Sequence, residues 1–209
     1  MNTRALIEKE AAGRPEPGRQ THATASRSRT ACRSAGWFAL LGVCGLALHL
    51  SAADPPALES HLEPLRPWLG KTWKGEFKDS KPDRPVFDVA RWERALNGQA
   101  VRVLHSINDG VYGGEAIILW DEKQQVATYY YFTTAGFRTT GTVKFEEGMI
   151  VTHEVVSGNA GGITEVRART QMLPDGTFQV KTEHLKDGQW GPGREVTYRE
   201  DATAKVVFK

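Results

Sequence analysis

Hydrophobic and polar positions alternate with a period of two along much of the chain after residue 70. Between residues 137 and 145, apolar or small side chains fall on one face and polar side chains on the other. Phe178 and Val180 alternate with Gln179 and Lys181 in the same way. Alternation of this kind is typical of a strand with one buried face. The pattern therefore predicts a body built almost wholly from β-strands.

Turn signals divide this body at intervals of about twelve residues. Asn-Gly and Asp-Gly pairs, which adopt the positive φ angles of tight hairpins, recur at Asn97-Gly98, Asp109-Gly110, Asp175-Gly176 and Asp187-Gly188. We expect nine or ten strands, near 72–79, 85–95, 99–107, 111–120, 126–134, 137–145, 149–157, 163–172, 177–185 and 193–200. Consecutive strands joined by such turns predict an antiparallel meander.

An open meander has two edges that can pair with other molecules, whereas a closed barrel has none. We therefore predict an all-β fold, a single up-and-down antiparallel β-barrel of about eight to ten strands. Before it, Leu58, Leu62 and Leu65 recur at helical spacing and predict a short helix over 57–66, ended by Pro67, that caps the barrel. Charges are too evenly spread for the lipid-facing band of an outer-membrane barrel.

The first 53 residues differ from this body. Residues 1–35 lack hydrophobic periodicity and predict a disordered leader, or a start codon placed too far upstream. Residues 36–53 have the layout of a signal peptide, with an uncharged apolar run of 15 residues followed by Ser51 and Ala53. We expect cleavage near Ala53, which would leave a secreted or periplasmic domain at 54–209. An uncleaved membrane anchor is the alternative, although a spanning helix needs about 20 apolar residues. Lipidation of Cys44 fits less well because Val43 is not small.

Charge and cysteine content exclude several functions of the body. The leader holds seven of the 27 Lys and Arg residues and three of the 25 Asp and Glu residues, so the body has 20 basic and 22 acidic residues. A body so close to neutral gives no electrostatic reason to expect nucleic acid as a partner. Both cysteines, Cys32 and Cys44, lie in the leader. We therefore expect no disulfide, thiol nucleophile or thiolate metal site in the body.

A short helix that runs into Gly70 and Trp73 and is followed by a meander resembles the calycin superfamily, in particular bacterial lipocalin-like domains of unassigned function. The lipocalin pattern is Gly-x-Trp, and this chain has one more residue between Gly70 and Trp73. The resemblance implies that Trp73 closes the barrel floor and that Arg199 stacks on its indole as a cation-π partner. The segment 68–75 is also similar to the opening of nitrobindin-type haem-binding barrels, which use a histidine to ligate iron.

Three histidines share strand parity with apolar neighbours. His105 alternates in phase with Val101 and Val103, His153 with Val151 and Val155, and His184 with Phe178 and Val180. We expect all three to point into the barrel, where a neutral imidazole can bind haem. The alternative is a core histidine whose hydrogen bonds are satisfied by the protein. We predict no metal site, because the three positions have no recognised ligand spacing.

Further candidates lie on neighbouring strands. Glu115 shares parity with Ile117 and Leu119, so it is either a buried carboxyl with a raised pKa or a residue at the barrel rim. Tyr129, Tyr131 and Thr139 would give an apolar lining with a few polar groups, as small-molecule sites show. Packing of the barrel wall is the alternative for the tyrosines.

These observations favour an exported lipocalin-like protein that binds a small apolar or amphipathic molecule in its barrel, without a cofactor. A haem-binding barrel of the nitrobindin type is the first alternative. A barrel filled by side chains, acting as a structural or interaction module, is the second. The sequence leans away from an enzyme, because no nucleophile and base occur at a recognisable spacing. A membrane partner is expected only through an uncleaved leader.

Overall fold

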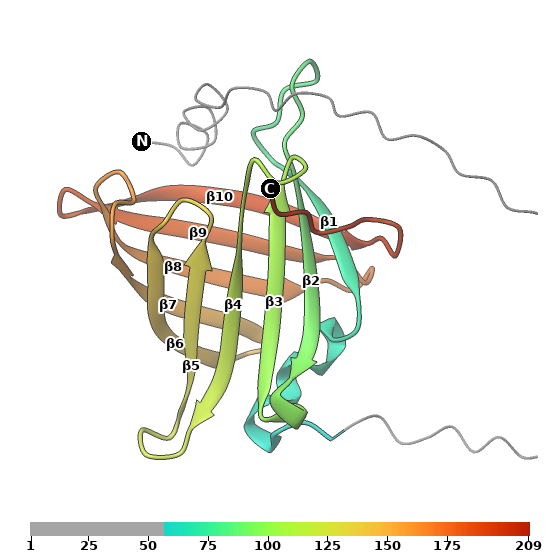
Figure 1. Ribbon diagram of the computed structural model, residues 1–209, viewed down its shortest axis with the longest axis vertical. Helices are drawn as coiled ribbons and strands as arrows, with labels where there is room; N and C mark the ends of the chain where they lie inside the picture. Colours follow the sequence, from blue (N-terminus) through green and yellow to red (C-terminus); the bar gives the residue numbers. More distant parts are fainter. Residues whose placement is uncertain (1–56) are drawn as a thin grey trace, which may run out of the picture. The chain divides into compact units, whose positions relative to one another are not determined.

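The computed structural model describes residues 57–209, so the expected leader, signal segment and cleavage near Ala53 lie outside the described residues. The described chain is almost entirely β-structure (Figure 1). Its ten strands are β1 Thr72–Phe77, β2 Phe87–Ala95, β3 Ala100–Ile107, β4 Tyr112–Asp121, β5 Val126–Thr133, β6 Arg138–Glu146, β7 Met149–Ser157, β8 Ile163–Met172, β9 Phe178–Lys186 and β10 Gln189–Glu200.

The ten strands form a closed barrel in which each strand pairs antiparallel with its neighbours in sequence. The first and last strands complete the ring, with Trp73 opposite Glu200 and Phe77 opposite Val196. Closure pairs both edges of the meander, so neither remains available to another chain. The predicted all-β, up-and-down antiparallel barrel is confirmed.

The strand boundaries follow the alternation and the turn signals closely. The first nine strands begin and end within two residues of the predicted positions. The tenth begins at Gln189 rather than near residue 193, and its pairing with β9 shifts register between Pro192 and Glu195. Proline cannot donate a ladder hydrogen bond, and an irregularity of this kind lets a strand continue past it.

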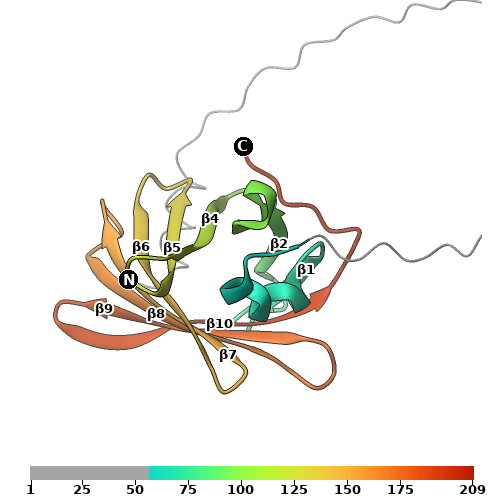
Figure 2. The same ribbon diagram turned by 90° about the horizontal axis from the view of Figure 1, so that it is seen from below.

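One end of the barrel is closed by η1, a 3-10 helix at Ser60–Trp68 (Figure 2). The predicted helix is present, but it is not ended by Pro67, because both Pro64 and Pro67 lie inside it. Prolines lack the N–H that an α-helical ladder needs, which favours a short 3-10 segment. Leu62 and Leu65 are fully buried and Trp68 is 3 % exposed, so these side chains form the floor. With η2 at Leu96–Gly98 also short, no helix within residues 57–209 is long and apolar enough to cross a membrane.

Trp73 lies at this floor, but its expected partner does not. The indole is 1 % exposed, packs edge-on against Phe178 at 5.0 Å between ring centroids and donates to the Trp68 carbonyl. Arg199 is exposed, because the neighbouring Tyr198 points inward and strand side chains alternate. The predicted Arg199 contact is therefore wrong. The cation over the Trp73 ring is Lys71, with Nζ 5.3 Å from the centroid.

Gly70 makes the turn from η1 into β1. Its φ is +74°, in the left-handed region that favours glycine. Its N–H donates to the Trp92 carbonyl on β2, which anchors the turn to the barrel wall. The residue therefore directs Trp73 into the barrel at the start of the first strand.

Candidate functional site

A cavity of about 200 Å³ lies inside the barrel. It exceeds the roughly 150 Å³ of an apolar protein cavity that can take up benzene. Most of its wall is apolar and comes from many strands, including Ile118, Ile150, Val166, Phe178 and Val180. A smaller number of polar side chains share this interior, which is the composition expected of a small-molecule site.

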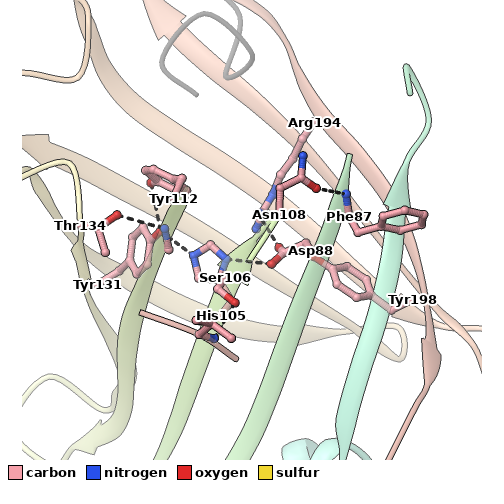
Figure 3. Close-up of polar contacts among 12 residues, drawn as sticks. Phe87, Asp88, His105, Ser106, Asn108, Tyr112, Tyr131, Thr134, Arg194 and Tyr198 are labelled. Carbon is pink, nitrogen blue, oxygen red and sulfur yellow. Dashed lines mark hydrogen bonds and ion pairs between the residues drawn. The ribbon is translucent and has the colours of Figure 1, made fainter. Parts of the chain in front are cut away.

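Asp88 on β2 is the centre of the polar cluster (Figure 3). Its side chain is only 1 % exposed. One carboxylate oxygen lies 3.1 Å from His105 Nδ1, and the other accepts from the Tyr198 hydroxyl at 2.7 Å and from Arg194 Nη1 at 3.3 Å. Residues from β2, β3 and β10 thus meet at one buried carboxylate.

The charges of this cluster stabilise one another. Burial by itself raises the pKa of Asp88, but His105 and Arg194 outweigh burial and hold the pKa below its ordinary value. Burial lowers the pKa of Arg194, but Tyr198 and Asp88 outweigh it and the pKa lies above its usual value. The buried pair is therefore ionised at neutral pH.

A hydrogen-bonded chain extends from Asp88 across the cavity. His105 Nε2 lies 2.7 Å from the Tyr131 hydroxyl, which lies 3.0 Å from the Tyr112 hydroxyl. Both ring nitrogens of His105 are therefore occupied by protein partners. Burial raises the pKa of Tyr131 well above its ordinary value, and Tyr112 raises it further. Tyr131 consequently stays protonated and can link the histidine to the cavity surface.

A second buried carboxyl, Glu154 on β7, faces the same interior. It is 7 % exposed and accepts from Thr139 Oγ1 at 2.6 Å and from Thr152 Oγ1 at 3.0 Å. Burial raises the pKa of Glu154 above its ordinary value, and the two threonine hydroxyls oppose that shift. The cavity thus contains two carboxyls whose environments move their pKa values in opposite directions.

Several cavity-lining side chains have polar atoms for which the described residues provide no hydrogen-bond partner, and the buried indole N–H of Trp92 is one of them. Within residues 57–209, neither the Tyr129 hydroxyl nor the His184 ring forms a hydrogen bond. Burial, and next Arg194, lowers the pKa of His184, so its imidazole is neutral at pH 7. These groups are available to a molecule in the cavity.

Glu115 and His153 do not face the cavity, so the predicted inward orientation of His153 is wrong, and so is the interpretation of Glu115 as a buried carboxyl. The Glu115 carboxylate pairs with Arg102 Nε at 2.8 Å on the outer face of β4. His153 is exposed, with Nε2 2.6 Å from Glu165. On both strands apolar residues occur on both faces, so the alternation does not identify the inner face. Pairing with the neighbouring strands places Ala116 and Glu154 on the inner face, and Glu115 and His153 therefore lie on the outer face.

The other predicted residues, His105, Tyr129, Tyr131, Thr139 and His184, line the one cavity. Sequence reasoning missed Asp88, Glu154, Arg194 and Tyr198. The alternation of inner and outer positions along the strands contains a signal for two of them. Arg194 alternates in phase with Val196, and Asp88 with Ala90, so each is a charged residue on an apolar face.

The arrangement suits the binding of a small organic molecule. Its apolar wall can hold a hydrocarbon body, and its polar cluster can hold a polar group. Within the part of the chain that the structure describes, no cluster of three His, Cys, Asp or Glu side chains could hold a metal ion. For a haem iron, His184 is the available imidazole, because both nitrogens of His105 are engaged and His153 lies outside.

Comparison with known proteins supports the architecture. No model of a known protein family and no curated protein matches the chain. The chain is similar to the crystal structure of Rv2717c from M. tuberculosis, with 13 % sequence identity, a TM-score of 0.52, and coverage of 69 % of this chain and 99 % of that one. At such low identity the likeness concerns the fold alone. Membership of the lipocalin-like domains stays a prediction.

Proposed function

We propose that this protein is an exported, lipocalin-like binding protein that holds a small amphipathic molecule inside its barrel. The observation that carries the proposal is the cavity of about 200 Å³, which has a mostly apolar wall and a polar cluster around Asp88. Burial of an apolar ligand body in such a cavity is favourable by about 25 cal/mol per Å² of surface removed from water. The polar cluster would set its orientation.

Calorimetric titration with 1-octanol tests this proposal. We expect saturable binding of one molecule per chain. Val166→Phe places a ring in the cavity and should weaken binding at least about tenfold, a loss of about 1.4 kcal/mol. Val155→Phe makes the same change on the outer face of the adjacent strand, where the side chain is 54 % exposed, and should leave binding unchanged.

The alternatives give different results in the same titrations. If neither 1-octanol nor octanoate binds saturably, the binding proposal fails and a structural or interaction module is favoured. Haem is a second candidate because His184 lines the cavity with a neutral, unpartnered ring. A Soret band on addition of haemin that His184→Ala abolishes would favour haem, whereas a band unchanged by that substitution would exclude His184 as the ligand.

A further inference from the structure

Arg194 has hydrogen-bonding capacity that the protein leaves unused. A guanidinium has five N–H donors, and the Arg194 side chain donates one of them, from Nη1 to Asp88. Among residues 57–209 it has no other hydrogen-bond acceptor. The side chain lines the cavity and keeps 28 % of its surface accessible, against 1 % for Asp88. Several N–H groups of a half-buried cation are thus open to the cavity.

The Tyr129 hydroxyl adds a second unused donor. Burial raises the pKa of Tyr129 well above its ordinary value, Glu154 raises it further and Arg194 lowers it. The hydroxyl is therefore protonated at neutral pH, and it lies within electrostatic range of Glu154 and Arg194. The indole N–H of Trp92, which also lines the cavity, is buried without a hydrogen-bond partner. Unused donors on several sides of one cavity indicate a missing acceptor.

The carboxylates of the cavity already have their donors. Both oxygens of Asp88 and both oxygens of Glu154 accept hydrogen bonds from the protein. The charge of Asp88 is balanced by Arg194 at 3.3 Å. Burial raises the pKa of Glu154, which favours its neutral form and reduces repulsion of a bound anion. The neutral His184 ring offers one donor and one acceptor. Counted together with Arg194 and Tyr129, the unused groups of the cavity therefore include more donors than acceptors.

We propose that the ligand carries a carboxylate, which binds Arg194 and accepts a hydrogen bond from the Tyr129 hydroxyl. The proposal rests on the binding function proposed above and specifies its ligand class. A carboxylate matches the planar fork of a guanidinium and makes charge-assisted hydrogen bonds, which are stronger than neutral ones. In this arrangement Asp88 holds the guanidinium in place while its remaining N–H groups bind the ligand.

Titration with octanoate and 1-octanol tests the proposal, because the two probes share a chain and differ in the head group. We expect the unmodified protein to bind octanoate at least about tenfold more tightly than 1-octanol, a difference of about 1.4 kcal/mol. Arg194→Gln should remove this preference by weakening octanoate binding at least about tenfold, because octanoate loses its charge partner whereas 1-octanol has no charge to pair. Arg169→Gln removes an exposed arginine from the outer face of β8 and should change neither affinity.

Tyr129→Phe is the second variant, for the case in which Arg194→Gln does not fold. It removes one hydroxyl without leaving a protein group unpaired, and should weaken octanoate binding about threefold to tenfold and 1-octanol binding by less. Equal affinity for the two probes in the unmodified protein would overturn the carboxylate proposal and leave the binding function standing. Equal losses for both probes in Tyr129→Phe would overturn it as well. Absence of binding by both probes defeats the binding function itself.

Discussion

Glu154 and Asp88 show how one barrel interior gives two carboxyls opposite properties. Asp88 has a cation, a histidine and a tyrosine hydroxyl around it, whereas Glu154 has two neutral threonine hydroxyls as hydrogen-bond partners. Burial penalises the charged form of each. Only Asp88 has enough compensation, so its pKa lies below the ordinary value and that of Glu154 lies above it.

The raised pKa of Glu154 predicts a pH-dependent cost to stability. Below its unfolded-state pKa the carboxyl is neutral in both states and has no effect. As pH rises through the unfolded and then the folded pKa, the folded chain binds more protons than the unfolded chain, so the free energy of unfolding falls. Glu154→Gln abolishes this ionisation. Its melting temperature relative to the unmodified protein should therefore be higher at pH 8 than at pH 4.

Thermal unfolding by circular dichroism at the two pH values measures this difference. Glu183→Gln is the matched control, because it removes an exposed carboxyl from the outer face of β9. A relative melting temperature of Glu154→Gln that does not change with pH, or that falls as pH rises, would contradict the assignment.

The strands themselves depend on close contacts between backbones. Gly141 on β6 has no room for a side chain, because a Cβ at this position would lie 1.9 Å from the His153 carbonyl oxygen and 2.8 Å from the Glu154 Cα. Both atoms belong to the backbone of β7 and cannot rotate away. The close approach therefore helps to position Glu154, which lies directly opposite Gly141 in the pairing of β6 with β7.

Gly141→Ala should consequently destabilise the barrel by about 1 to 3 kcal/mol, because β6 and β7 must separate locally. A loss of this size lowers the melting temperature of a domain this long by about 2 to 4 °C per kcal/mol. Gly191→Ala on β10 is the control, since a Cβ there meets no atom within 4 Å. Thermal denaturation should give a lower melting temperature for Gly141→Ala than for Gly191→Ala. Equal melting temperatures would mean that β6 and β7 adjust without cost.

At the scale of the whole molecule, the ring is complete within the described residues. The closing pair of β1 and β10 joins Trp73 to Glu200, and the floor is formed by η1, which begins at Ser60. The strand pairs that close the ring and the helix that forms its floor thus lie within residues 57–209.

The proposed export predicts a defined processed product. Expressed in a host with a secretion pathway, the chain should be recovered with Asp54 as its first residue, because Ser51 and Ala53 are the small residues that signal peptidase requires. The recovered domain should retain a β-rich circular dichroism spectrum. Intact mass measurement checks the first point, and a folded product that retains residues 1–53 would contradict it.

Sequence alone determined the strands, the turns and the need for closure, because these depend on local alternation and on glycine at positive φ. It also placed Tyr129, Tyr131 and His105 correctly on the inner face. Local pattern was ambiguous for Glu115 and His153, where apolar residues occupy both faces and only pairing with neighbouring strands decides which face turns inward.

Tertiary structure alone decided the chemistry of the interior. The Asp88 contacts to Arg194 and Tyr198 span 106 and 110 residues of sequence, and no local pattern specifies which side chains meet across a closed barrel. The cavity depends in the same way on side-chain volumes from many strands at once. The sequence therefore predicts a barrel, whereas the unused donors of Arg194 and Tyr129 become visible only when the ring is closed.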